Sequence, residues 1–283
     1  MDATKTLWLV TNAASGSNSS ESADQIRQHC TDAGIALTRL ICFPDDDLPT
    51  PAELDAAGTR LVAVYAGDGT VNSLVTSLYG WGGAVLVLPG GTMNLLYHRL
   101  HGERDMAEVL AAVAAGRARP HRPGILRCAF GDGLAGVMTG PGTQWNDVRE
   151  AIRNTDIPAV ATGVAAAIGQ SVAAPMIACV EPQLGRSEGY PLVMLTPGDD
   201  GFVVDAYYAE NLEQYLAQGL ALLRRDFREG PHDTLGKPKA LTIGNVSGEP
   251  VGLLIDGEPA DAGSSVRFTL VPCEVDLLAT EGQ

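Results

Sequence analysis

The sequence has few basic residues: 19 Lys and Arg stand against 34 Asp and Glu, for a formal net charge of −15. Affinity for nucleic acids comes mainly from Lys and Arg on phosphates, so this composition argues against a nucleic-acid partner. The same charge gains nothing from anionic lipid surfaces. We therefore expect any membrane contact to be local, transient or apolar.

Cysteine is also sparse, with five residues far apart in the chain and no C-x-x-C pair. This spacing predicts neither a disulfide framework nor a zinc site, and it fits a reducing cytoplasm. Four of the cysteines stand in apolar runs and are typical of small core residues: Cys42, Cys128, Cys179 and Cys273.

The chain lacks a convincing membrane-spanning run. No long apolar stretch follows a basic region near Met1, so no signal peptide is expected. Residues 157–180 carry no charge, but they are rich in Ala and interrupted by Pro158, Gly163 and Pro175. A spanning helix needs about 20 strongly apolar residues. We expect instead a buried Ala-rich helix followed by a strand over 176–180, and no transmembrane segment.

Strand and helix patterns alternate in the first half of the chain. Expected strands cover 7–10, 35–42, 61–66 and 84–88, and expected helices cover 26–33, 71–78, 93–100 and 106–115. Alternation of this kind favours a parallel sheet covered by helices. The sequence thus predicts an α/β domain over residues 1–122.

A basic, proline-containing stretch at 117–124 is typical of a linker, and short β-like runs dominate beyond it. These runs cover 125–130, 134–139, 176–180, 192–196, 202–208, 241–243, 251–255, 266–270 and 274–279. Two helical patterns interrupt them, at 145–153 and 211–227. We predict an antiparallel β domain over 123–283 with inserted helices, its last residues packing back on the first domain.

The strongest local signal is Gly67-Asp68-Gly69-Thr70-Val71-Asn72, which joins a buried strand directly to a helix. At the carboxyl end of a parallel strand, glycines let phosphates approach the backbone and helix N-termini offer free N–H groups. Asp68 could orient phosphates or a metal. The alternative is a tight turn in which Thr70 caps the helix, and this segment alone does not decide between the two.

Two further loops follow buried strands in the same way. Pro89-Gly90-Gly91-Thr92-Met93-Asn94 follows one strand, and Thr11-Asn12-Ala13-Ala14-Ser15-Gly16-Ser17 follows another. Loops at successive strand ends can face one another, so the three together predict a phosphate-binding edge.

The second half contains two acidic turns. Pro197-Gly198-Asp199-Asp200-Gly201 and Ile255-Asp256-Gly257-Glu258 each follow an apolar run. Asp-Gly is the expected chemistry of a hairpin turn, which is the alternative for both. If alternation continues past residue 255, Asp256 and Glu258 point to one side and could bind magnesium or shift each other's pKa.

In order and context these motifs resemble the diacylglycerol kinase catalytic domain, which sphingosine kinases and bacterial lipid kinases share. The resemblance implies a nucleotide between two domains, the first related to phosphofructokinase and NAD kinase, the second an antiparallel β-sandwich. It implies an ATP-dependent lipid kinase of the cytoplasm that takes a lipid alcohol, such as diacylglycerol, from a membrane surface.

The resemblance also assigns roles to residues. It implies catalytic Asp68 and Glu258, with Glu258 as general base, and magnesium ligands Asp200 and Asp256. The implied ATP contacts are Asn12, Ser15, Gly16, Gly67, Asp68, Gly69, Thr70, Asn72, Gly91, Thr92 and Asn94.

The sequence departs from the family pattern at several positions. Ala66 replaces its first glycine, Ser73 a frequent Glu, and Leu95 an Asp that many members carry, and no aspartate stands near 123–124. Two alternatives stay open. One is a NAD kinase-like enzyme with a soluble substrate, because Gly-Asp-Gly is shared with those relatives, although Pro89 to Asn94 argues against it. The other is a lipid- or nucleotide-binding protein with weakened catalysis, which the missing acids favour and the retained Asp68 and Glu258 oppose. Nothing in the sequence selects one lipid or predicts an oligomeric state.

Two other motifs carry no functional prediction. Residues 131–136 fit G-x-G-x-x-G, but β-like runs flank them, so we interpret them as a turn between strands. His98 and His101 stand three apart on a predicted helix without a third ligand, which favours a structural role.

Overall fold

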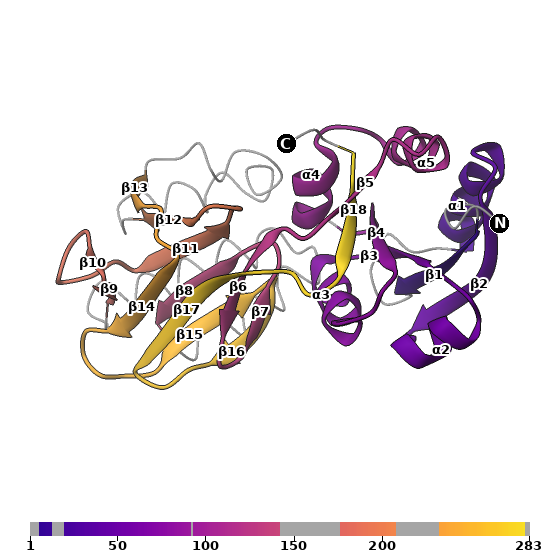
Figure 1. Cartoon of the computed structure of the whole chain (residues 1–283). Coiled ribbons are helices and arrows are strands. Elements are labelled where there is room, and N and C mark those ends of the chain that lie inside the picture. Colours follow the sequence, from indigo (N-terminus) through magenta and orange to yellow (C-terminus); the bar gives the residue numbers. More distant parts are fainter. Residues whose placement is uncertain (1–5, 13–19, 92, 142–175, 208–231, 281–283) are drawn as a thin grey trace. The chain divides into compact units, whose positions relative to one another are not determined.

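The computed structural model describes residues 6–12, 20–91, 93–141, 176–207 and 232–280. The chain divides into two compact units, each with its own sheets (Figure 1). Unit 1 comprises Met1–Pro123 and Pro272–Gln283, and unit 2 comprises Gly124–Val271.

Unit 1 is built on a single mostly parallel sheet. Its strands are β1 (Thr6–Asn12), β2 (Ala36–Phe43), β3 (Leu61–Ala66), β4 (Ala84–Pro89), β5 (Arg119–His121) and β18 (Asp276–Ala279). They lie in the order β2-β1-β3-β4-β18-β5, and only the β18–β5 pair is antiparallel. The parallel α/β fold predicted for this part of the chain is confirmed.

Five helices accompany this sheet among the described residues. They are α1 (Ser20–Asp32), α2 (Pro51–Ala56), α3 (Asp68–Ser77), α4 (Leu95–His101) and α5 (Met106–Ala114). Helix α1 packs against β2 and α5, α3 against β3, and α4 against β4 and β18. Helix α2 was not predicted, although Thr50 and Glu53 form a capping box at its start, with Pro51 as its first residue.

The C-terminal strand completes the sheet of unit 1. β18 pairs in parallel with β4 and antiparallel with β5, which follows α5. The N–H of Cys273 donates to the carbonyl of Pro123 over 2.9 Å, where the chain re-enters the unit. The last described residues of the chain thus share a sheet with the first ones.

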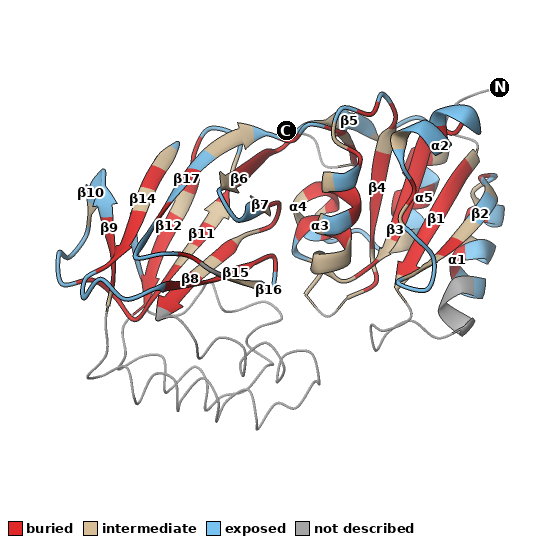
Figure 2. Cartoon of the chain, turned by 90° about the horizontal axis from the view of Figure 1, so that it is seen from below, coloured by how far each residue is buried: buried red, intermediate tan, exposed pale blue. Residues whose placement is uncertain are grey.

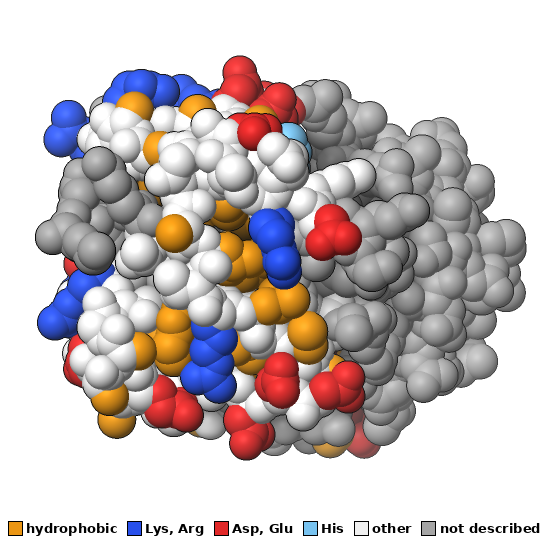
Figure 3. Space-filling view, turned by 90° about the vertical axis from the view of Figure 1, so that its right-hand side faces the viewer, with side chains coloured by type: hydrophobic (Ala, Val, Ile, Leu, Met, Phe, Trp, Pro, Cys, Tyr) orange, Lys and Arg blue, Asp and Glu red, His pale blue; other side chains and the backbone are white. Residues whose placement is uncertain are grey.

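One edge of this sheet is the strand β2. The guanidinium of Arg39 on β2 stacks 4.5 Å from the ring centre of Trp8 on β1, which leaves Trp8 only 6% exposed. Hydrophobic side chains gather around basic ones in the middle of the face seen in Figure 3. A bulge between Leu7 and Trp8 further breaks the regularity of the strand pair, as is common at sheet edges.

Unit 2 is a sandwich of two antiparallel sheets. One sheet has the order β10-β9-β14-β17-β6-β7, with β6 (Gly124–Cys128), β7 (Gly131–Gly133), β9 (Ile177–Glu181), β10 (Gln183–Leu184), β14 (Ala240–Asn245) and β17 (Ser265–Pro272). The other has the order β13-β12-β11-β8-β15-β16, with β8 (Val137–Pro141), β11 (Leu192–Pro197), β12 (Phe202–Tyr207), β13 (His232–Gly236), β15 (Val251–Ile255) and β16 (Glu258–Asp261).

The two sheets share one hydrophobic core. Ile177, Leu241 and Phe268 from the first sheet pack in the same cluster as Phe202 and Leu253 from the second, all fully buried. Figure 2 shows these buried residues along the strands, as it does along β1, β3 and β4 of unit 1. The predicted antiparallel β-sandwich is therefore confirmed.

Three predicted helices lie outside the described residues, namely those at 145–153 and 211–227 and the Ala-rich helix expected before residue 176. Residues 131–133, interpreted as part of a turn, form the short strand β7 instead. Within the part of the chain that the structure describes, no helix is long and apolar enough to cross a membrane.

Candidate functional site

The strand-end loops of unit 1 emerge at one edge of its sheet. β1, β3 and β4 are parallel neighbours, with Thr11 in register with Tyr65 and Ala66 in register with Pro89. Loops that follow the carboxyl ends of adjacent parallel strands start side by side, where open α/β sheets bind their ligands. Asn12 at the end of β1 and the segments after Ala66 and Pro89 therefore form one candidate site.

A direct hydrogen bond joins the first two of these segments. The side-chain amide of Asn12, the last residue of β1, donates to the hydroxyl oxygen of Thr70 over 2.7 Å. Thr70 lies in the first turn of α3, whose N-cap is Gly67. The bond spans 58 positions of sequence and ties the end of β1 to the start of α3.

The second and third segments meet backbone to backbone. A Cβ atom built on Gly91 would lie 2.6 Å from the Cα of Gly67, closer than real Cβ contacts. Only glycine at position 91 allows this approach. The two glycine-containing loops therefore pack directly against each other.

Asn94 shapes the third segment from within. Its side-chain oxygen accepts the N–H of Gly91 over 2.7 Å, and its amide donates to the Gly91 carbonyl over 2.9 Å. Its backbone is left-handed, with φ of 50°, a conformation that Asn tolerates better than most residues. Helix α4 therefore begins at Leu95, two residues later than predicted, because Asn94 serves as its N-cap.

Asp68 connects α3 to the start of α4. Its two carboxylate oxygens accept the N–H groups of Leu95 and Leu96 over 3.3 and 3.4 Å. A carboxylate at a helix N-terminus is favoured by the helix dipole and by the free N–H groups there. This contact was not predictable from the sequence, because the partner groups are backbone atoms 27 and 28 positions away.

The remaining residues predicted in unit 1 divide into two groups. Gly69 and Asn72 lie on α3, half-buried, and their carbonyl oxygens accept the hydroxyls of Ser73 and Thr76. Ser15, Gly16 and Thr92 lie outside the described residues.

In unit 2, Asp256 is a buried residue of a tight hairpin. Its Oδ2 accepts the N–H of Leu134 over 2.7 Å, and its Oδ1 accepts those of Ala135 and Gly136 over 2.9 Å each. The N–H of Asp256 in turn donates to the Gly136 carbonyl over 3.0 Å. Asp256 thereby fixes the loop between β7 and β8.

The expected alternation past residue 255 is wrong. Ile255 pairs with Glu258, so Asp256 and Gly257 form a two-residue turn, with φ of 48° and 87°. Both values are positive, as in the type I′ turn that Asp-Gly favours. Asp256 is 8% exposed, whereas Glu258 is exposed as the first residue of β16. The two carboxylates therefore have different surroundings.

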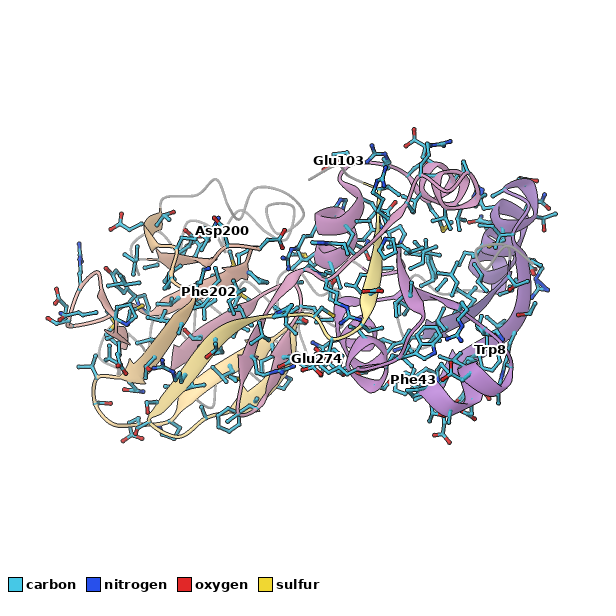
Figure 4. The ribbon with its side chains drawn as sticks, in the orientation of Figure 1. Trp8, Phe43, Glu103, Asp200, Phe202 and Glu274 are labelled. Carbon is cyan, nitrogen blue, oxygen red and sulfur yellow. The ribbon has the colours of Figure 1, made fainter. Side chains whose placement is uncertain are left out.

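Asp200 lies in the four-residue loop between β11 and β12 and is paired with a lysine. Its Oδ1 contacts the ammonium of Lys237, and the hydrogen bond and charge of this lysine lower the pKa of Asp200. Figure 4 shows Asp200 outside the ribbon, with its side chain 77% exposed, whereas Phe202 two residues later is fully buried. The neighbouring Asp199 accepts the N–H of Gly124 over 3.2 Å.

These contacts do not fit a magnesium ion held by Asp200 or Asp256. Among the described residues no three His, Cys, Asp or Glu side chains gather as a metal site would require. Magnesium prefers several oxygen ligands in octahedral geometry. Asp256 instead accepts three N–H groups, and Asp200 faces an ammonium.

Comparison with known proteins identifies the class to which this site belongs. Residues 6–125 match the family model described as the diacylglycerol kinase catalytic domain. The matched part of the chain holds Asn12, Gly67–Thr70 and Gly91–Asn94, and the resemblance drawn from the motifs is confirmed.

Solved structures resemble the chain over nearly its whole length. A diacylglycerol kinase from Bacillus anthracis str. Sterne aligns with a TM-score of 0.63 at 16% identity and covers 97% of each chain. A second structure from that organism, provisionally assigned as a diacylglycerol kinase, aligns at 0.63 and 15% identity over 97% of this chain and 95% of its own. At such identity the likeness shows the fold alone. No curated protein matches the chain.

Proposed function

We propose that this protein is an ATP-dependent lipid kinase that transfers the γ-phosphate of MgATP to the hydroxyl of diacylglycerol or a related lipid alcohol. The observation that carries the proposal is that Asn12 at the end of β1 meets the segments after β3 and β4, through the Asn12–Thr70 hydrogen bond and the Gly67–Gly91 contact. The family match over residues 6–125 supports the same reaction class.

Phosphoryl transfer asks a protein mainly for positioning and for neutralisation of charge. The first turn of α3, at Asp68–Thr70, offers backbone N–H groups next to glycines, which suits a polyphosphate. Asn12, Ser15, Gly16, Gly67, Gly69, Thr70, Asn72, Gly91, Thr92 and Asn94 are proposed to line this nucleotide site. Asp68 would orient the phosphates, or the magnesium that enters with ATP, from its place between α3 and α4.

Glu258 is the proposed general base. Its carboxylate is exposed at the start of β16, on a hairpin whose turn is fixed by Asp256. It would accept the proton of the lipid hydroxyl as the oxygen attacks the γ-phosphate. Glu258→Gln should abolish turnover and leave the affinity for ATP unchanged, measured by calorimetric titration. Undiminished turnover in this variant would remove Glu258 from the mechanism.

The test of the reaction is incubation with MgATP and a panel of dispersed lipids that includes diacylglycerol and a sphingoid base. A phosphorylated lipid made by the natural chain and not by Asp68→Ala supports the proposal and names the acceptor class. Turnover of a soluble acceptor such as NAD in place of every lipid would favour the NAD kinase-like alternative.

A second candidate is a nucleotide- or lipid-binding protein with weakened catalysis. The observation in its favour is Leu95, a 39% exposed residue in the first turn of α4 whose backbone N–H donates to the Asp68 carboxylate. The resemblance places an acid at this position in many members. Tight ATP binding with no phosphorylated product from any acceptor would support this candidate, and Leu95→Asp would then be the variant in which to look for restored turnover.

A further inference from the structure

The two acids of unit 2 that resemble magnesium ligands both face partners supplied by the chain itself. Asp200 faces the ammonium of Lys237, and Asp256 faces three backbone N–H groups. We propose that neither Asp200 nor Asp256 holds a resident metal ion, and that Lys237 and the 134–136 loop take over the charge-balancing role at these two acids. These ion-pair and hydrogen-bond partners are part of the chain itself, whichever lipid is phosphorylated.

The case is strongest at Asp256. A carboxylate has about four lone-pair directions, and three of those of Asp256 accept N–H groups over 2.7–2.9 Å. The side chain is 8% exposed, and its backbone conformation, with φ of 48°, suits Asp. A cation here would have to displace hydrogen bonds that hold the 134–136 loop. Asp256 is thus a positioning residue for the hairpin that carries Glu258.

At Asp200 the partner is a cation rather than a set of N–H donors. Lys237 directly follows β13. Its main chain packs closely on the loop that carries Asp200, since a Cβ atom built on Gly201 would lie 2.6 Å from the Lys237 carbonyl oxygen. Two further oxygens of the loop also accept hydrogen bonds: Asp199 Oδ1 accepts the N–H of Gly124, and the Gly201 carbonyl accepts the N–H of Gly198. The Asp200 carboxylate thus already has a cationic partner, and two neighbouring oxygens are engaged within the chain.

A functional consequence follows if the proposed function holds. Magnesium would be needed only as the partner of ATP, so the magnesium dependence of turnover should track the concentration of MgATP. Free magnesium beyond that concentration should not change the stability of unit 2.

The experiment uses the full chain without nucleotide. Binding of Mn²⁺, a paramagnetic stand-in for Mg²⁺, is measured by electron paramagnetic resonance for the natural chain, Asp200→Asn and Asp256→Asn. We expect the same number of bound ions in all three, because neither acid contributes a site. Loss of one bound ion in either variant would overturn the proposal.

A second measurement covers the case in which Asp256→Asn fails to fold. Amide hydrogen exchange of Leu134, Ala135 and Gly136 is followed in the natural chain with Mg²⁺ and with EDTA. Because Asp256 itself binds these amides, their protection should be equal in the two buffers. A rate about tenfold or more faster in EDTA, the scale of one lost hydrogen bond, would show that a metal ion orders the loop and would contradict the proposal.

Lys237→Met, with Lys239→Met as the matched control on the same segment, tests the pair at Asp200. The Lys237 change should raise the pKa of Asp200, followed by NMR of its side-chain carbon, and the Lys239 change should raise it less. These changes in the pKa of Asp200 test only its ion pair with Lys237, and they do not depend on whether the protein phosphorylates a lipid. An unchanged pKa of Asp200 in Lys237→Met would refute the role given to this lysine.

Discussion

Gly91 and Gly67 meet at the centre of the candidate site, and the contact is asymmetric. A methyl group added at Gly91 would lie 2.6 Å from the Cα of Gly67 and 3.2 Å from the side-chain oxygen of Asn94. A methyl group added at Gly67 would lie 3.9 Å from the Cα of Gly91, an ordinary van der Waals distance. Gly91→Ala should therefore force the two loops apart, whereas Gly67→Ala should not.

The magnitude follows from packing. Overfilling a well-packed site costs about 1–3 kcal/mol. This cost applies at Gly91 because the obstructing atoms are mostly backbone atoms. Gly67 has φ of −74° and ψ of 164°, which alanine adopts readily. The loss of unfolded-state entropy on replacing glycine is similar in both variants and largely cancels between them. We expect Gly91→Ala to be less stable than Gly67→Ala by about 1–3 kcal/mol.

The assay is urea unfolding of the full chain, followed by tryptophan fluorescence. Trp8 and Trp81 are buried in unit 1 and report on its unfolding. The slopes of the two variants should agree, so that a shift in midpoint measures stability. Equal midpoints for Gly91→Ala and Gly67→Ala would refute the close backbone contact from which the site was built.

Three further predictions concern single contacts. Asn12→Ala and Thr70→Val should each weaken ATP binding, and a double-mutant cycle should give a coupling free energy of about 0.5–1.5 kcal/mol. Additive effects would show that the hydrogen bond between the two side chains does not contribute to binding. The stabilising effect of the Lys237–Asp200 pair should be present above the ordinary Asp pKa and fade as pH falls through the lowered pKa of Asp200. When the melting temperature is plotted against pH, Lys237→Met should therefore change the acidic part of the curve and leave the part near neutral pH flat. Burial lowers the pKa of His101 from 6.5 to about 4, so between these pH values the unfolded chain binds more protons than the folded one. About 3 kcal/mol of folding stability should therefore be lost as the pH falls from 6.5 to 4. His101→Gln should remove this loss, and an unchanged dependence of stability on pH in this variant would contradict the prediction.

The fold was largely predictable where apolar residues form continuous runs. β3 and β15 have the predicted limits because each is an apolar segment bounded by turn residues. β16 was missed because Glu258-Pro259-Ala260-Asp261 has no apolar periodicity, and it forms a strand only through pairing with β15. The start of α2 did carry a signal, since Thr50, Pro51 and Glu53 form a recognisable helix N-terminus.

The site was predictable in its loops but not in its contacts. Three glycine- or serine-containing segments after buried strands pointed to the edge where Asn12 and Thr70 meet. The partners of Asp68 and Asp256 are backbone N–H groups far away in sequence, and such groups carry no side-chain signature. Lys237 was likewise invisible as the partner of Asp200, because only the packing of the segment after β13 brings the two together.

Transfer of labelled γ-phosphate from MgATP to dispersed lipids tests the central claim most directly. The account predicts a labelled lipid that requires the natural chain and disappears with Asp68→Ala, while Lys239→Met, a change within unit 2, keeps full turnover. Bound ATP without a labelled lipid, or labelling that survives in Asp68→Ala, would contradict it.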